Sequence, residues 1–185
     1  IRSLKESLIA NKITKVYGIL NGTSNYVLSS MDRNKKNFQE VLSDAKKLGY
    51  AETNPSADLN GSDVMAKLKI LSSLFFNSFL SKNIYVEGIK EIDTTDIRNA
   101  NKLGYKIKLL GFAELLDNNI YQRVHPTLIK KDSYVAGIDG VLNAVIVDGK
   151  PIGQSIIQGE GAGPAATTSA LVSDISSILR GNIKF

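Results

Sequence analysis

Residues 105–129, YKIKLLGFAELLDNNIYQRVHPTLI, contain two stretches of apolar and aromatic residues on either side of a short polar segment. Over Tyr105–Leu115 and Ile120–Ile129 the hydrophobic pattern shifts toward a period of two, which is typical of strands with one buried face. The intervening Asp117-Asn118-Asn119 is a turn of the kind that joins antiparallel neighbours. This stretch therefore predicts a β-hairpin.

Further strands are expected on both sides of this hairpin. After it, the same alternation predicts strands over Gly140–Val147 and Pro151–Gln158, connected by a turn at Asp148-Gly149-Lys150. Before it, β-branched and aromatic residues predict strands over Ile13–Leu20 and Ile84–Ile89.

Helical periodicity dominates the first half of the chain and returns at its end. The hydroxyls of Thr23 or Ser24, and of Thr94 or Thr95, are suited to cap two of these helices, because they accept hydrogen bonds from free backbone N–H groups. The expected helices are Ile1–Ala10, Thr23–Met31, Phe38–Leu48, Asn60–Phe79, Thr94–Leu103 and Pro164–Leu179.

The order of these elements predicts the fold class. Helices that are grouped first and strands that are adjacent later indicate an α+β domain. We expect a mixed or mostly antiparallel sheet that is covered on one face by helices. The 185 residues suit a single domain over 1–185.

Composition and charge narrow the classes of function. The net charge of +5 is spread along the chain, so no basic stripe points to nucleic acid. The longest apolar run, Val64–Leu80, is too short and too charged to span a membrane. The absence of cysteine excludes disulfides and thiolate chemistry and fits a reducing compartment, so we expect a cytoplasmic protein. The opening IRSLKESLIANKI has neither an initiator Met nor a signal-peptide pattern, and we expect it to follow an earlier segment.

An acidic cluster lies in residues 52–71, ETNPSADLNGSDVMAKLKIL. Glu52, Asp58 and Asp63 fall within twelve residues, and Lys67 follows four residues after the last of them. Residues four apart on a helix share a face, so Asp63 and Lys67 are expected to meet. Lys67 also lies beside the apolar stripe of its helix, where partial burial would make its amine useful as a proton carrier.

Three interpretations of this cluster remain open from the residues alone. The pair of Asp63 and Lys67 could be an ordinary surface ion pair, with the other acids in a solvated loop. Alternatively, Glu52 and Asp58 could hold a ligand ammonium while Lys67 moves a proton. The three carboxylates could also bind a divalent metal ion.

Two loops offer further binding groups. NGTSNY at 21–26 leaves free N–H groups at the start of a helix, which suits an anion such as a carboxylate, although an ordinary capped helix has the same pattern. GEGAG at 159–163 follows a strand and opens a helix, so it could admit a cofactor closely or simply form a tight turn. The chain's one histidine, His125, lies in a strand before Pro126, and we expect it to be structural.

Taken together, four stretches resemble the catalytic region of homoserine dehydrogenase over essentially the whole chain. They are GILNGTSNYVLSSM, FQEVLSDAKKLGYAETNPSADLNGSDVMAKLKIL, GVLNAVIVDG and GEGAGPAATTSALVSDI. The resemblance implies an enzyme of amino-acid biosynthesis, on the aspartate pathway to threonine and methionine. It would interconvert L-homoserine and L-aspartate 4-semialdehyde with NADP or NAD. It also implies a homodimer whose Rossmann domain precedes this region, with the terminal segments 1–10 and 164–180 packing towards that domain.

The resemblance assigns a role to each matching position. Lys67 matches the proton-transferring lysine, and Asp63 is the other catalytic residue. Gly163 matches a glycine that touches the nicotinamide cofactor. No metal ligand is assigned in this region. The positions that match the substrate pocket are Gly22, Thr23, Tyr50, Glu52 and Asp58. A non-catalytic dimerisation or regulatory module is the remaining alternative.

Overall fold

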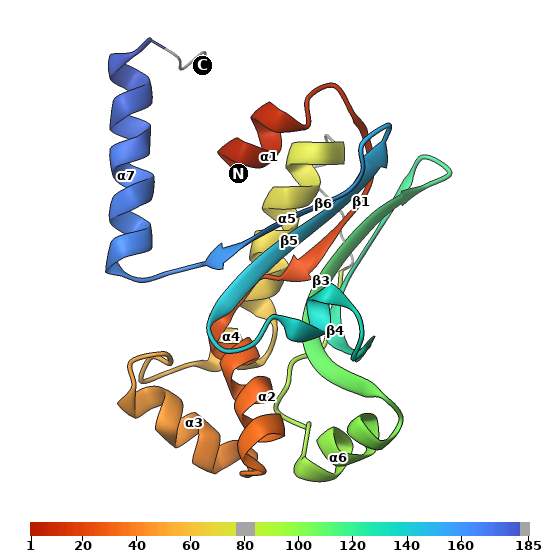
Figure 1. The fold of residues 1–185 in the computed structure, drawn as a ribbon, viewed down its shortest axis with the longest axis vertical. Coiled ribbons are helices and arrows are strands. Elements are labelled where there is room, and N and C mark those ends of the chain that lie inside the picture. The colour runs from red at the N-terminus through yellow and green to blue at the C-terminus, as the bar shows by residue number, and fades with distance from the viewer. Residues whose placement is uncertain (77–83, 182–185) are drawn as a thin grey trace.

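The computed structural model describes residues 1–76 and 84–181. Its centre is a six-stranded sheet with the order β2-β4-β3-β1-β5-β6 (Figure 1). Every neighbouring pair is antiparallel except β2 and β4, which are parallel. The strands are β1 Lys12–Ile19, β2 Tyr85–Val86, β3 Tyr105–Leu116, β4 Asn119–Lys130, β5 Leu142–Lys150 and β6 Gly153–Glu160.

The hairpin of β3 and β4 has the predicted form. Twelve residue pairs run from Tyr105 opposite Lys130 to Leu116 opposite Asn119. Asp117 and Asn118 adopt positive φ angles of 48° and 62°, a conformation that Asn and Asp tolerate better than other non-glycine residues. The local turn chemistry therefore determines the register of the longest strand pair.

The turn predicted at Asp148-Gly149-Lys150 is wrong, because all three residues belong to β5. The chain reverses instead at Pro151 and Ile152, so β6 begins at Gly153 rather than at the predicted Pro151. Gly149 lets β5 run close to β1, since a Cβ there would lie 2.8 Å from Ile13 Cδ1 and 3.3 Å from the Lys12 carbonyl oxygen. A glycine that permits close approach of strands was thus taken for a turn signal.

The helices lie close to their predicted positions, with different caps and bounds. Asn21 caps the helix expected from Thr23, and Asp93 caps the one expected from Thr94, because each side chain accepts a hydrogen bond from the first turn. The helices are α1 Arg2–Ser7, α2 Gly22–Asn34, α3 Phe38–Lys47, α4 Ser56–Leu59, α5 Ser62–Phe76, α6 Thr94–Lys102 and α7 Pro164–Leu179, with a short 3-10 helix, η1, over Tyr134–Gly137.

Of two predictions around α5, one lies partly outside the described residues and one needs correction. The predicted end of its helix at Phe79 lies outside the described residues, as α5 is described to Phe76. The strand expected over Ile84–Ile89 is only β2, because Gly88 packs directly against the backbone of Leu59 and turns the chain away from the sheet.

The helices and the sheet enclose the main core on one face. Val64 and Leu68 of α5 are fully buried against Val16 of β1 and Ala113 of β3. A smaller apolar cluster on the opposite face includes Val135, near η1. The α+β class and the helix-covered, mostly antiparallel sheet are therefore confirmed.

Helix α7 differs from the others in its surroundings. It stands apart from the sheet at the end of β6 (Figure 1), and none of its residues is buried. Its exposed apolar residues include Leu171, Val172, Ile175 and Ile178. No helix within the described residues is long and apolar enough to cross a membrane.

Candidate active site

The site begins where β1 passes into α2. Asn21, which is 4% exposed, follows the strand in extended conformation, and its Oδ1 accepts the Ser24 N–H at 2.8 Å. Gly22 then starts the helix in close contact with another segment, since a Cβ there would lie 2.7 Å from the carbonyl oxygen of Val141. Thr23 Oγ1 donates to the carbonyl oxygen of Tyr50 at 2.7 Å, which ties the helix start to the loop after α3.

The side-chain amide of Asn21 contacts two carboxylates of the acidic cluster, Asp58 and Asp63. Asn21 Nδ2 donates to Asp58 Oδ1 at 2.7 Å and to Asp63 Oδ2 at 2.8 Å. Asp63 also lies in the first turn of α5, where the helix dipole favours a negative charge. The two carboxylates are therefore held side by side by a neutral donor.

Lys67 reaches the same cluster from the second turn of α5. Its Nζ forms an ion pair with Asp63 Oδ2 at 2.8 Å and donates to the carbonyl oxygen of Leu20 at 3.0 Å. The expected pairing of Asp63 with Lys67 is thus present. The Lys67 side chain is 45% exposed, so its ammonium lies at the surface of the cleft rather than in the apolar interior.

Glu52 faces the cleft from the loop before α4. It is exposed and, among the described residues, forms no hydrogen bond or ion pair. A carboxylate without a protein partner beside Lys67 and Asp63 is available to a cationic ligand group. Tyr50 also lines this side, with its ring centroid 5.0 Å from that of Tyr26.

These groups line one cleft of about 590 Å³, which is within the range of small-molecule sites. The cleft brings together every residue proposed from the sequence as a catalytic, substrate or cofactor group. Its lining is Asn21, Gly22, Thr23, Leu48, Gly49, Tyr50, Glu52, Asp58, Asp63, Lys67, Val141, Asn143, Glu160, Gly161, Ala162, Gly163 and Pro164.

The far wall of the cleft is the glycine loop between β6 and α7. Gly163 has a φ of 108°, which a residue with a side chain adopts only with strain, and Pro164 begins α7 directly after it. A Cβ on Gly161 would overlap the side-chain amide of Asn143. The Oδ1 atom of Asn143 is buried and has no hydrogen-bond partner within the described part of the chain.

This wall fits a nicotinamide ring. The loop offers backbone without bulky side chains, so a flat ring can approach closely. The strands of the described residues are mostly antiparallel and form no βαβαβ dinucleotide-binding unit.

The metal interpretation of Glu52, Asp58 and Asp63 finds no support. Across the described residues, no group of three or more His, Cys, Asp or Glu side chains is arranged to hold a metal ion. The amide donors of Asn21 and the ammonium of Lys67 already engage Asp58 and Asp63.

His125 lies away from the cleft. Its Nδ1 is 2.8 Å from the carbonyl oxygen of Pro126, and its ring centroid is 6.3 Å from that of Tyr85. These local contacts suit the structural role that we expected for it.

The sequence interpretation missed Asn21 and Asn143. Asn21 was taken only as half of an Asn-Gly turn, although an Asn between a strand and a helix is also an N-cap signal. Asn143 lies within a strand pattern, and no local signal distinguishes it from a solvated residue.

Comparisons with known proteins identify the family of this chain. Residues 1–176 match the family model described as homoserine dehydrogenase. The homoserine dehydrogenase of Neisseria gonorrhoeae is 44% identical over 97% of this chain and 42% of its own length. The crystal structure of a homoserine dehydrogenase from Thiobacillus denitrificans superposes with a TM-score of 0.92 at 44% identity, again over 97% of this chain and 42% of that one.

A more distant structure carries a cofactor. A hyperthermophilic archaeal homoserine dehydrogenase mutant in complex with NADPH has a TM-score of 0.78 at 26% identity, over 96% of this chain and 51% of that one. The chain spans less than half the length of the bacterial relatives given above. By sequence and by fold, it belongs to the homoserine dehydrogenase family.

Proposed function

We propose that this chain supplies the substrate-binding and proton-transfer half of an NAD(P)-dependent homoserine dehydrogenase. The main observation behind the proposal is the shared cleft. Its lining includes the paired side chains of Lys67 and Asp63, the carboxylate of Glu52 and the glycine loop. The substrate class follows from the charges, because an amino acid with a terminal alcohol or aldehyde presents an ammonium and an oxygen that exchanges a proton.

Binding of the substrate uses the two opposite charges on its α-carbon. Glu52 receives the ammonium of homoserine, with Asp58 and Asp63 as neighbouring negative charges. The free N–H groups at the start of α2, after Asn21, suit the substrate carboxylate. Gly22 and Thr23 lie at this end of the cleft.

Proton transfer is the task of Lys67. In the direction of reduction, its ammonium gives a proton to the carbonyl oxygen of aspartate 4-semialdehyde, and the product is an alcohol. In the direction of oxidation, its neutral amine takes the proton of the homoserine hydroxyl. Asp63 orients the amino group through their contact at 2.8 Å. A bound nicotinamide cofactor supplies or accepts the hydride, and Gly163 and Asn143 are the residues of this chain that would lie against its ring.

The whole enzyme extends beyond this chain. We propose that a Rossmann domain binds most of the cofactor, NADP or NAD, and that α7 packs against it, since the apolar residues of α7 are exposed here. For α1, Leu4 and Leu8 are buried in the main core, so only its outer side is free for such a contact. We also propose that the whole enzyme is a homodimer.

The test uses a fusion of this chain to the Rossmann domain of a homoserine dehydrogenase. Its activity is measured as the rate of NADPH oxidation with aspartate 4-semialdehyde as the substrate. Lys67→Met should lower kcat by about 100-fold or more, because a positioned proton carrier contributes roughly that factor. Lys69→Met, on the same helix but outside the cleft, is the matched control and should retain the rate. A near-normal rate for Lys67→Met would refute its proton-transfer role.

Binding separates this proposal from a non-catalytic module. The chain itself should bind L-homoserine, and Glu52→Gln should weaken that binding by removing the charge that faces the ammonium. A chain that shows no homoserine binding under any condition would favour a module that serves only assembly.

A further inference from the structure

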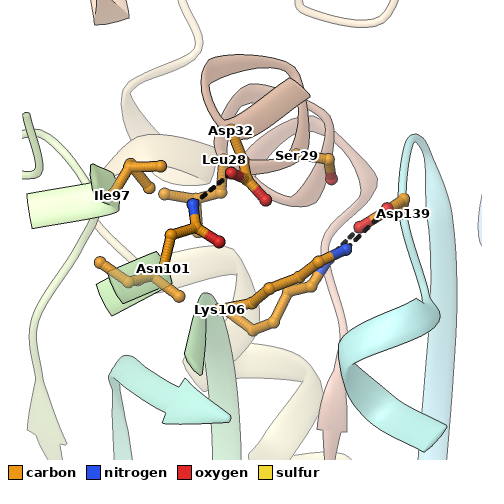
Figure 2. A pocket seen from close by; sticks show the side chains of 9 residues that line it. Leu28, Ser29, Asp32, Ile97, Asn101, Lys106 and Asp139 are labelled. Atoms are coloured by element: carbon orange, nitrogen blue, oxygen red, sulfur yellow. Dashed lines mark hydrogen bonds and ion pairs between the residues drawn. The ribbon is translucent and has the colours of Figure 1, made fainter. Parts of the chain in front are cut away.

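Lys108 occupies an unusual position in the middle of β3. It is 1% exposed, and among the residues whose burial is described it is the one charged side chain that is buried. Its neighbour two residues earlier on the same strand face, Lys106, is 25% exposed and points toward Asp139 near Ser29 of α2 (Figure 2). Burying an ammonium is costly unless every N–H finds an acceptor.

All three N–H groups of Lys108 do find acceptors. Its Nζ donates to Asp139 Oδ1 at 2.7 Å, to the carbonyl oxygen of Ile138 at 2.6 Å and to Asn25 Oδ1 at 3.0 Å. Burial lowers the pKa of Lys108, and its hydrogen bond with Asp139 opposes that shift. Two of the acceptors belong to the segment 138–142 and one to helix α2.

Asn25 extends this contact along the same segment. Its Nδ2 donates to the carbonyl oxygens of Ile138 and Leu142, at 3.1 and 3.0 Å. The Gly140 N–H donates to Ser29 Oγ at 3.2 Å. The segment 138–142 is therefore fastened to α2 at its start, its middle and its end, and we call these contacts the Lys108 clamp.

The clamp joins two walls of the cleft. Gly22 opens α2 one turn before Asn25, and Val141 lies in the middle of the clamped segment. The two are already in close contact, because a Cβ on Gly22 would lie 2.7 Å from the Val141 carbonyl oxygen. Asn143, which faces the glycine loop, follows directly after the segment.

We propose that Lys108 is a positioning residue for the reaction, which sets the distance between the Gly22 wall and the Val141 wall of the substrate cleft through Asn25. The inference rests on the proposed function, since it assigns the positioned walls to homoserine. A buried ion pair is often replaceable by apolar side chains without loss of stability. The buried ammonium of Lys108 bonds to both α2 and the segment 138–142. We therefore assign it a role in holding these two walls of the cleft in position, rather than a role in stability.

The experiment compares Lys108→Met with Lys106→Met in the isotope-labelled chain. Both changes remove a lysine of β3 that contacts Asp139, but Lys106 makes no contact with Asn25 or Ile138. NMR titration with L-homoserine should show binding that is weaker by on the order of 10-fold for Lys108→Met, since small misplacements of binding groups are costly. Lys106→Met should bind as the unchanged chain does.

A second measurement needs no ligand. Amide hydrogen exchange should become faster at Gly140 and at the start of α2 in Lys108→Met, but not in Lys106→Met. Unchanged exchange at these sites would overturn the inference. If the unchanged chain fails to bind homoserine, the proposed function is refuted. The exchange measurement still shows whether Lys108 holds the segment 138–142 against α2.

A third variant covers the case in which Lys108→Met does not fold. Ser29→Ala removes the bond to Gly140 and leaves the buried charge in place. It should speed exchange at Gly140 and weaken homoserine binding by a factor of about 2–3. Unchanged values of both in folded Ser29→Ala would overturn the inference.

Discussion

At the scale of single residues, the site depends on neutral amides as much as on charges. Asn21 donates to two carboxylates and accepts from the helix that it caps, so every polar atom of its side chain is used. Without such a donor, Asp58 and Asp63 would repel each other, and Asp63 would lose its fixed position beside Lys67.

This arrangement makes an isosteric substitution informative. Asn21→Asp keeps the helix cap, because Asp is as good an N-cap as Asn, but it replaces two donated hydrogen bonds with a third carboxylate. We expect kcat to fall by about 10-fold or more, with an altered pH profile, because repulsion among the acids disturbs the pair of Asp63 and Lys67. Steady-state kinetics over pH on the enzyme joined to its Rossmann domain is the measurement.

Another cap provides the control for this prediction. Asn37 caps α3 with the same accepted hydrogen bond, from Glu40 N–H, and does not line the cleft. Asn37→Asp should therefore leave the kinetics unchanged. Equal kinetic effects from the two substitutions would show that Asn21 acts only as a helix cap.

At the scale of elements, local patterns predicted the strands and helices because their causes are local. The Asp117-Asn118 turn and the capping box of α3 each involve residues within a few positions of one another. The errors came from distant partners. Gly149 lies closely against Lys12 and Ile13, which are on another strand.

The site was predictable only in part for the same reason. Asp63 and Lys67 are four residues apart, so helical spacing alone brought them together. The partners of Asn21 lie 37 and 42 residues away, and Asp139 lies 31 residues from Lys108. Contacts of that range leave no local pattern. Glu52, Asp58 and the two loops at 21–26 and 159–163 were candidates from the residues themselves, whereas Tyr50 came only from the family resemblance.

Close strand packing predicts one large stability effect. A Cβ on Gly18 of β1 would overlap the carbonyl oxygen of Ala144, its diagonal neighbour on β5. Because backbone cannot give way as a side chain does, Gly18→Ala should lower the free energy of unfolding by about 2–3 kcal/mol. Urea unfolding measures the difference.

The matched control is a glycine in open space. Gly159→Ala in β6 meets no atom within 4 Å and has an ordinary φ. This substitution should be neutral or stabilise by about 0.5 kcal/mol, because it restricts the unfolded chain. If Gly18→Ala were equally neutral, the spacing of β1 and β5 would be wider than described.

At the scale of the whole molecule, Asp139 links pH to the stability of the fold. It contacts Lys106 and Lys108 of β3 and Arg33 of α2, and Asp32 is the nearby acid on that helix. Although burial alone would raise the pKa of Asp139, the hydrogen bonds and charges of the two lysines hold it below its usual value.

The sign of the pH effect follows from this direction. A carboxylate whose pKa is lowered by folding stabilises the fold above its unfolded pKa of about 3.9, and that contribution is lost as the pH falls through the lower folded value. Asp139→Asn should therefore be less stable than the unchanged chain at neutral pH, and the two should converge in acid. Thermal unfolding between neutral and strongly acidic pH tests this, and parallel curves would contradict it.

Helix α7 gives the molecule one more property. Its first residue, Pro164, belongs to the wall of the cleft, while the rest of the helix projects away with its apolar side uncovered. Because Pro164 joins α7 directly to the glycine loop, we expect a partner that binds the outer length of α7 to shift that loop as well. On this view, assembly through α7 and the shape of the cleft are coupled without any separate signalling element.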